Sequence, residues 1–227
     1  MKIGVISDIE GNDEKLHKVI NELDDCDLVA NLGDCVGDKG DSNAVIELLN
    51  QNKVKSILGN HDLEIILDKD IAPEKFLAPM IYESLDSFET DIKLSKANFN
   101  SLKKLNLGFR VNHNGNIYSF YHSYYGQYKG NTYFEYIDKD NAEALLKISK
   151  SDIIFIGHNH IPEMFRIKGD DINHKRIKES TTLPLETGFK YIINVGSIGA
   201  PRDKKIDYSY AVVDTIKTKV SLIVKRK

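Results

Sequence analysis

The stretch Lys2-Ile-Gly-Val-Ile-Ser-Asp-Ile-Glu-Gly-Asn12 decides the fold, because a short apolar strand runs directly into two carboxylates and a glycine turn. Residues 3–6 show no alternating polar side chain, which is typical of a strand buried on both faces of a parallel sheet. Asp8 and Glu10 stand two positions apart, so in an extended chain their side chains point the same way, roughly 7 Å apart. They can therefore face one cation. The alternative is that Asp8 caps a turn and Glu10 is solvated.

The bulk composition is that of a globular protein. A chain of 227 residues can form one large domain or two small ones, and 41% apolar residues are enough for a core. The net charge of −3 and the pI near 6.2 argue against a nucleic-acid partner, since such proteins carry a basic excess. Cys26 and Cys35 are too few for a disulfide framework. Without an apolar leader or a run that could span a membrane, we expect a cytoplasmic protein.

A repeating βα pattern fills the first quarter of the chain. Apolar runs that suit strands occur at 3–6, 28–32 and 54–58. Asp8, Asp34 and Asn60 follow these runs at intervals of 26 positions, each just past a predicted strand end. In a parallel sheet those ends lie side by side, at the edge where such folds bind ligands.

The rest of the chain predicts further helices and strands within one domain. We expect residues 63–110 to form a helical layer over the sheet, and the polar, turn-rich residues 168–190 to form a projecting hairpin or loop. The remaining expected elements are strands at 117–121, 152–156 and 191–195, a helix at 140–149, and a closing hairpin of 208–214 and 219–224. No linker is visible, so residues 1–227 are predicted to be a single domain.

Side chains that bind metals gather behind the predicted strand ends. They are Asp8, Glu10, Asp34, Asn60, His61, His122, His158 and His160, and they include four of the seven histidines. We expect the other three, at positions 17, 113 and 174, to be surface residues or satisfied by neighbours. Mixed oxygen and imidazole ligands suit Mn, Fe, Zn, Co or Ni. Eight groups are too many for one such ion, but they suit two ions about 3.5–4 Å apart, an arrangement that serves phosphoryl chemistry.

The order of these residues resembles the calcineurin-like metallophosphoesterase superfamily. Five blocks carry the resemblance: Asp8-x-Glu10, Gly33-Asp34, Gly59-Asn60-His61-Asp62, His122 and Gly157-His158-x-His160. The ending Asn194-Val-Gly-Ser-Ile-Gly-Ala-Pro-Arg202 resembles the small bacterial and archaeal branch of that family. The resemblance covers nearly the whole chain. It implies an α/β fold, a four-layer αββα sandwich of two mixed sheets flanked by helices.

The resemblance also implies a role for each residue of the cluster. Asp34 would bridge two divalent ions. The first ion would be held by Asp8, Glu10 and His160, and the second by Asn60, His122 and His158. A hydroxide shared by the ions would attack phosphorus in line, and His61 would donate a proton to the leaving oxygen. Asp62 would either orient and charge that imidazole or cap a helix, and Asn60 would also contact the substrate.

Glu10 departs from the family's pattern, which has histidine in the first block. Two divalent ions, three carboxylates and one hydroxide sum to no net charge, whereas a histidine here would leave one positive charge. A less positive centre should attract phosphate and activate water less strongly. We therefore expect a preference for a harder ion, Mn rather than Zn, and an alkaline pH optimum.

Two further predictions concern a small phosphorylated substrate. His122 is followed by Ser-Tyr-Tyr125 where the family often has glycine, so Tyr124 would stack on a nucleobase or another aromatic leaving group, or else pack as an ordinary strand residue. Arg202 would bind the phosphate as a bidentate donor, or else be a surface residue.

The function that follows is hydrolysis of phosphomonoesters or phosphodiesters at a dinuclear metal centre. One alternative is a catalytically weak or inactive scaffold that retains the fold, as in the retromer-type relative. Retention of Asn60, His61 and the ligand histidines argues against the scaffold, and only Glu10 argues for it. Another alternative is a sensor that binds metal or nucleotide without hydrolysis.

Overall fold

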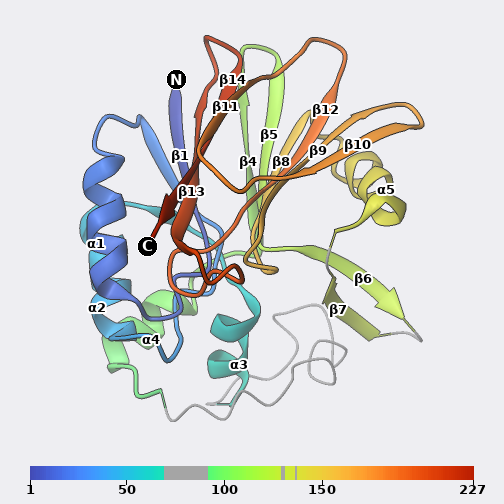
Figure 1. Ribbon diagram of the computed structural model, residues 1–227. Helices are drawn as coiled ribbons and strands as arrows, with labels where there is room; N and C mark the ends of the chain where they lie inside the picture. Colours follow the sequence, from blue (N-terminus) through green and yellow to red (C-terminus); the bar gives the residue numbers. More distant parts are fainter. Residues whose placement is uncertain (69–91, 129–130, 136) are drawn as a thin grey trace.

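The structure, a computed structural model, describes residues 1–68, 92–128, 131–135 and 137–227 (Figure 1). Two six-stranded sheets lie face to face, and helices cover their outer sides. Each sheet contains both parallel and antiparallel neighbours. The predicted α/β fold of two mixed sheets flanked by helices is confirmed.

The first sheet carries the opening stretch near its middle. Its order is β11 (Thr181–Pro184), β14 (Lys219–Arg226), β13 (Ile206–Asp214), β1 (Lys2–Ile6), β2 (Leu28–Asn31) and β3 (Lys55–Ser56). Strand β1 runs parallel to β2 and antiparallel to β13. Ile3, Val5 and Ile6 are fully buried, because both faces of this strand are covered.

The second sheet supplies the other half of the core. Its order is β10 (Asp171–Arg176), β9 (Pro162–Lys168), β12 (Lys190–Val195), β8 (Ile153–Ile156), β5 (Asn116–Tyr121) and β4 (Gly108–His113). Strands β12, β8 and β5 are parallel, while β9 and β4 run antiparallel to their neighbours. A separate hairpin follows β5, formed by β6 (Tyr124–Tyr128) and β7 (Asn131–Glu135).

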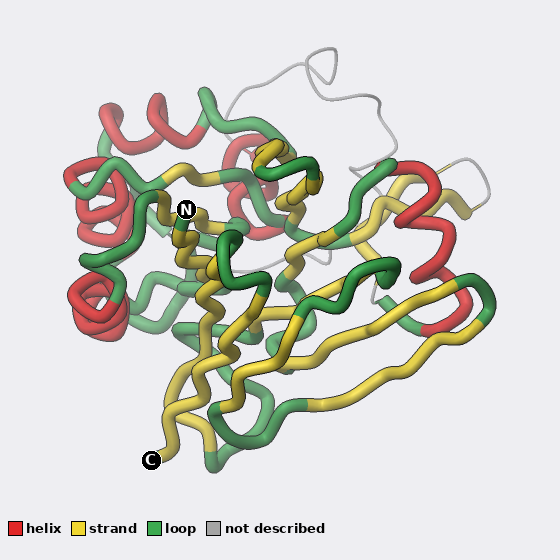
Figure 2. Tube along the Cα trace, turned by 90° about the horizontal axis from the view of Figure 1, so that it is seen from above, coloured by secondary structure: helices red, strands yellow, loops and turns green. Residues whose placement is uncertain are grey.

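Helices form the two outer layers, as the view from above shows (Figure 2). Those on the side of the first sheet are α1 (Asp13–Glu22), α2 (Ser42–Gln51) and α4 (Lys96–Leu102), and α5 (Lys139–Ser149) covers the second sheet. Leu16 and Val45 pack with Ile6 in one outer core, and Leu145 packs with Ile154 in the other. A third apolar cluster lies between the two sheets and packs them against each other, so the layers run helices, sheet, sheet, helices.

Capping side chains fix where the helices begin. Asn12 is the N-cap of α1, and its side chain accepts a hydrogen bond from the Lys15 N–H. Asp41 accepts from the N–H groups of Asn43 and Ala44 at the start of α2. The helix α3 (Asn60–Asp68) starts directly at a predicted site residue.

Three predicted segments differ in detail from what the sequence pattern suggests. The strand expected at 54–58 is only two residues long, because Ile57 pairs with Asn106 in an isolated bridge and the Leu58 N–H donates to the Asn106 carbonyl. In the segment 63–110, where a helical layer was expected, the structure shows the rest of α3, the helix α4 and the start of β4. Residues 69–91 lie outside the described part. Residues 168–190 were expected to project as a hairpin or loop. They contain β10, an edge strand of the second sheet, and β11, an edge strand of the first.

Among the residues that the structure describes, no helix is both long enough and apolar enough to cross a membrane.

Candidate metal centre

The predicted ligands meet where strands of both sheets end. The first sheet contributes Asp8 and Glu10 after β1, Asp34 after β2 and Asn60 at the start of α3. The second sheet contributes His122 after β5 and the pair His158 and His160 after β8. The packing of one sheet on the other therefore brings together residues that are up to 152 positions apart in sequence.

Five of these residues have a left-handed backbone. The φ angle is 53° at Asp8, 55° at Glu10, 52° at Asp34, 71° at His158 and 58° at His160. Such a conformation costs about 1–3 kcal/mol at a residue other than glycine and persists only where neighbours enforce it. Here the N–H groups of Ile9 and Glu10 both donate to the Asp34 carbonyl, at 2.9 and 3.0 Å. Strain of this kind concentrates at functional sites.

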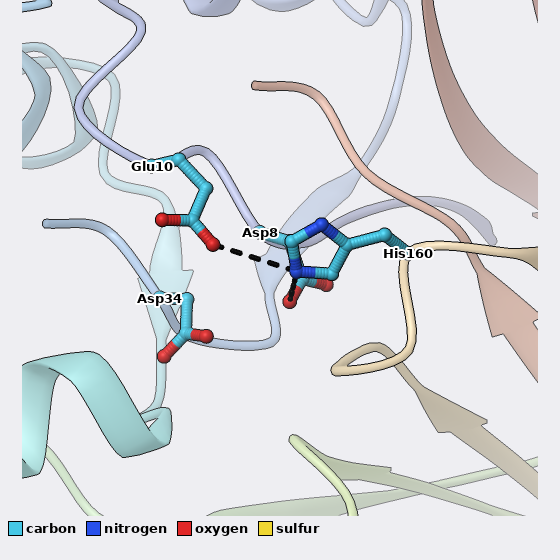
Figure 3. A group of neighbouring side chains, drawn as sticks. All are labelled: Asp8, Glu10, Asp34 and His160. Carbon is cyan, nitrogen blue, oxygen red and sulfur yellow. Dashed lines mark ion pairs between the residues drawn. The ribbon is translucent and has the colours of Figure 1, made fainter. Parts of the chain in front are cut away.

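The first group consists of Asp8, Glu10, Asp34 and His160, whose ligand atoms all lie within 4.8 Å of one another (Figure 3). Nε2 of His160 lies 3.2 Å from Asp8 Oδ1 and 3.4 Å from Glu10 Oε1. Nδ1 of the same ring donates to the Ala200 carbonyl at 2.6 Å, and this bond directs Nε2 toward the carboxylates. The group can hold a metal ion.

The second group shares Asp34 with the first. Nε2 of His122 lies 3.3 Å from Asp34 Oδ2 and 3.0 Å from Asn60 Oδ1. Nδ1 of His158 lies 3.0 Å from the same Asn60 oxygen. The Leu32 carbonyl accepts a 2.9 Å hydrogen bond from Nδ1 of His122, which again turns Nε2 into the site.

The carboxylates of the first group are in an environment that fits a cation. Oε1 of Glu10 is buried and accepts no hydrogen bond from any described residue. Burial raises the pKa of Glu10, despite the hydrogen bond from His61. Burial would also raise the pKa of Asp34, but the charge and hydrogen bond of His122 outweigh it and lower that pKa. A buried anionic cluster is costly unless cations or donors balance it, and carboxylate oxygens with imidazole nitrogens are a donor set for Mn, Fe, Co, Ni or Zn.

The pKa values of the histidines in this site shift in opposite directions. Burial alone would lower the pKa of His122 and of His160, but the nearby Asp34 and Asp8 respectively raise each pKa to about 9. Burial lowers the pKa of His158 to about 4, with a further contribution from the charge of His122. His158 is therefore a neutral imidazole, which is the form that binds metal.

His61 stands at the edge of the first group, next to Glu10. Its Nδ1 lies 3.0 Å from Glu10 Oε2 and 3.9 Å from Asp34 Oδ2, and its backbone N–H donates to Asp34 Oδ1 at 2.9 Å. Burial would lower the pKa of this ring, but the hydrogen bond to Glu10 and the charges of Asp34 and Glu10 raise it to about 10.

Asp62 is completely buried below the site. One carboxylate oxygen accepts from the N–H groups of Cys35 and Val36 at 3.0 and 3.2 Å, and the other accepts from the Gly59 N–H at 3.0 Å. Asp62 is the third residue of α3 and so is not its N-cap, but it makes a capping contact by accepting from Gly59, which immediately precedes the helix. They also tie the start of α3 to the loop that carries Asp34.

Besides Asn60, the two other predicted substrate-binding residues lie in segments next to the metal groups. Arg202 is exposed, its N–H donates to the His160 carbonyl at 3.4 Å, and it lines a cavity of about 680 Å³. Tyr124 is the first residue of β6, two positions after His122.

The groups that orient the candidate ligands were not predictable from the sequence. The carbonyls of Leu32 and Ala200 direct His122 and His160, and a backbone carbonyl leaves no signal in a sequence. Asn159, the residue between two histidines, was not predicted to take part in the site, although its amide is hydrogen-bonded on both sides. Its position inside the Gly157-His158-x-His160 block was the available signal.

Comparison with known proteins agrees with the fold. A sequence model described as "Calcineurin-like phosphoesterase superfamily domain" matches residues 1–218. An uncharacterised protein of Methanocaldococcus jannaschii is 29% identical over 223 residues, which are 97% of this chain and 86% of that protein.

Two solved structures share the fold. A metallophosphoesterase from Sphaerobacter thermophilus superposes with a TM-score of 0.74 at 24% identity, covering 100% of this chain and 88% of that one. A hypothetical protein from Pyrococcus horikoshii gives a TM-score of 0.67 at 19% identity, with 99% and 88% covered. With the family match spanning almost the whole length and its ligand blocks meeting at one site, the chain belongs to the calcineurin-like phosphoesterase superfamily.

Proposed function

We propose that the protein is a hydrolase that cleaves phosphomonoesters or phosphodiesters at a centre of two divalent cations. The observation that carries this proposal is that two groups of ligands share Asp34, one with Asp8, Glu10 and His160, the other with Asn60, His122 and His158. A carboxylate shared in this way is what a two-metal clamp on a transferring phosphoryl group requires.

The chemistry that two bound cations supply is a hydroxide nucleophile near neutral pH and neutralisation of charge on the phosphoryl oxygens. The protein's part is to hold the ligands in place and to move a proton. Glu10 fixes the His61 ring through Nδ1, so the ring's other nitrogen, Nε2, is the atom that would pass a proton to the leaving oxygen. Asp62 would act on His61 indirectly, because its hydrogen bonds fix the start of α3.

The organic part of the ester is proposed to lie toward the cavity beside the His158–His160 loop. This cavity of about 680 Å³ is lined by Asn159 and Arg202, among other residues, and is large enough for a small phosphorylated molecule. Arg202 would then hold a phosphate oxygen, and Asn60 would contact the substrate from the metal side. Tyr124 would contact an aromatic leaving group.

The cation is proposed to be Mn, with Fe, Zn, Ni or Co as alternatives. Glu10 adds a third carboxylate to the centre where the family pattern has histidine, and this favours a hard ion. The compartment is proposed to be the cytoplasm, on the composition of the chain.

The test is an ester screen with a matched pair of variants. The protein is stripped of metal, loaded separately with Mn, Fe, Co, Ni or Zn, and assayed on p-nitrophenyl phosphate and bis(p-nitrophenyl) phosphate. Hydrolysis by the wild type should fall by more than about 100-fold in Asp34→Asn, since even residues that only orient metal ligands are worth 10–100-fold. Asp171→Asn, an exposed residue of β10, is the control and should change nothing.

The second candidate, a catalytically weak or inactive scaffold that retains the fold, is favoured by Glu10 alone. If the wild type hydrolyses neither ester with any of the five metals, the hydrolase proposal fails and the scaffold takes its place. Tight cation binding without hydrolysis would instead favour the sensor.

A further inference from the structure

The loop that presents two of the ligands is held in a costly conformation. His158 and His160 both have left-handed backbones, with φ of 71° and 58°, and Asn159 stands between them. A left-handed backbone is strained at any residue other than glycine, and here two such residues stand within three positions. Neighbouring groups must enforce this geometry, since the loop would otherwise relax and carry both imidazoles away from the site.

The amide of Asn159 supplies part of that enforcement. Its Oδ1 accepts a hydrogen bond from the Ile161 N–H at 2.8 Å and another from Asn194 Nδ2, also at 2.8 Å. Nδ2 of Asn194, in β12, donates as well to the Gly157 carbonyl at 2.6 Å. Asn194 therefore ties the entry of the loop to its middle.

A buried carboxylate holds the other side of the same amide. Asn159 Nδ2 donates to Glu163 Oε1 at 2.5 Å, and Glu163, in β9, is only 3% exposed. Its second oxygen, Oε2, lies 2.8 Å from Nε2 of His174 and 3.7 Å from Nε of Arg176, both in β10. A buried carboxylate is costly without such partners, so the hairpin of β9 and β10 is what allows Glu163 to be there.

His174 is held by its neighbours, which matches the prediction that this histidine is satisfied by them. Its ring stacks on Phe165 with centroids 4.3 Å apart and planes 6° apart. Its side chain is 28% exposed, so it forms the outer end of a chain of contacts that runs inward through Glu163 and Asn159.

We propose that Asn159, Glu163 and Asn194 form a polar clamp that positions His158 and His160 for metal binding, with His174 as its outer support. This inference rests on the proposed metal-dependent function. In the contacts described above, no side chain of the three clamp residues touches a residue of the metal groups. Each clamp residue therefore acts as a positioning residue, through the backbone of the loop. A role confined to hairpin stability would lower the melting temperature without changing metal affinity.

The test measures metal binding and loop protection in full-length variants. Glu163→Ala removes the acceptor of Asn159 and the partner of His174, whereas Glu163→Gln keeps the size and one acceptor oxygen. The matched control is Glu186→Ala, which removes a 45% exposed carboxylate that pairs with Arg166 of the same β9 strand. Mn²⁺ affinity is measured by titration, and amide hydrogen exchange of residues 157–161 is measured in the metal-free protein.

Glu163→Ala should bind Mn²⁺ about 10–100-fold more weakly than the wild type and exchange faster at residues 157–161. Glu163→Gln should recover most of both losses, and Glu186→Ala should match the wild type. If Glu163→Ala does not fold, His174→Ala tests the same clamp from its outer end and should weaken Mn²⁺ binding severalfold.

Unchanged Mn²⁺ affinity and unchanged loop exchange in Glu163→Ala, or in His174→Ala where the first does not fold, would overturn the clamp even if the melting temperature fell. Failure of the wild type to bind any cation would instead overturn the proposed function. In that case the hydrogen exchange of the metal-free variants alone decides whether the clamp exists.

Discussion

At position 10, a carboxylate lies 3.0 Å from Nδ1 of His61 and 3.4 Å from Nε2 of His160. One side chain therefore links the proposed proton donor to the first metal group. Because Glu10 is buried and its Oε1 accepts no hydrogen bond within the described structure, that oxygen is the atom most suited to a cation. The choice of residue at this position should set both the metal preference and the state of His61.

Replacing Glu10 with histidine tests this link. The variant Glu10→His removes one negative charge from the centre and the hydrogen bond to His61. We expect the preferred metal to shift from Mn toward Zn and the pH optimum to fall, because a more positive centre activates water more strongly. Metal analysis and pH–rate profiles of both proteins provide the measurement. An unchanged metal preference together with an unchanged pH optimum would contradict the role given to Glu10.

Arg202 supports a second prediction about a single residue. Its exposed side chain lines the cavity beside the ligand loop, and a guanidinium can bind two phosphate oxygens. Arg202→Ala should raise KM about 10–100-fold with little change in kcat, since hydrogen bonds to charged groups contribute about 1.5–3 kcal/mol. Arg226→Ala, which removes a surface arginine that donates to the Lys178 carbonyl, serves as the control. Equal KM values in the two variants would show that Arg202 is a surface residue that does not bind the phosphate.

Among the elements, the loops after β2 and β3 approach so closely that only glycine fits between them. Gly33 has φ of +103°, and a Cβ on it would collide with the backbone nitrogen of Gly59. These two loops present Asp34 and Asn60, which belong to the proposed second metal position. Their close approach therefore sets the spacing of two ligands.

Gly33→Ala should separate these loops and weaken Mn²⁺ binding at least tenfold, beyond the cost of the backbone conformation alone. Gly115→Ala is a matched control, because Gly115 has φ of +77° but nothing within 4 Å of its Cβ position. The control should lose about 1–2 kcal/mol of unfolding free energy and no metal affinity. Urea unfolding and metal titration measure the two quantities. Equal metal affinity in both variants would mean that the loops do not set the spacing.

The contact between α1 and the first sheet should make stability depend on pH. Glu22 accepts hydrogen bonds from the hydroxyl groups of Tyr208 and Tyr210, at 2.8 and 2.6 Å, and lies 3.5 Å from Lys225. Burial would raise the pKa of Glu22, but these partners outweigh it and lower the pKa below its usual value of 4.5. Its contribution to stability is then fully present above the unfolded-state pKa and is lost as the pH falls through the folded-state pKa.

Glu22→Gln should therefore be less stable than the wild type at neutral pH and more nearly equal to it at about pH 3. Urea unfolding of both proteins at the two pH values measures the difference in unfolding free energy. A gap that stays constant or widens in acid would show that the carboxylate charge of Glu22 does not stabilise this contact.

For the whole molecule, the βα pattern of the first sheet was predictable from local sequence, whereas the four layers were expected from the family resemblance. An apolar run precedes each of Asp8, Asp34 and Asn60, and it places two carboxylates and one amide just past strand ends. Long-range pairing left no comparable signal. Strand β11 joins β14 of the first sheet, although it follows β10 of the second, and sequence periodicity does not reveal which edge a strand will pair with.

The same limit applies to the site. The candidate ligands could be proposed from the sequence because their residue types are chemically distinctive. The contacts of Asp62 with three backbone N–H groups, and of Glu163 with Asn159 and His174, depend on how loops and hairpins fold back on one another. Residue type alone predicts neither.

One carboxylate, Asp34, is proposed to join two metal positions. A crystal of the protein soaked in Mn²⁺ and measured for anomalous scattering tests this most directly. We expect two peaks about 3.5–4 Å apart, one on each side of Asp34, with Glu10 bound to the peak nearer His160. A map with no peak at Asp34, or with a single peak that Asp34 does not contact, would contradict it.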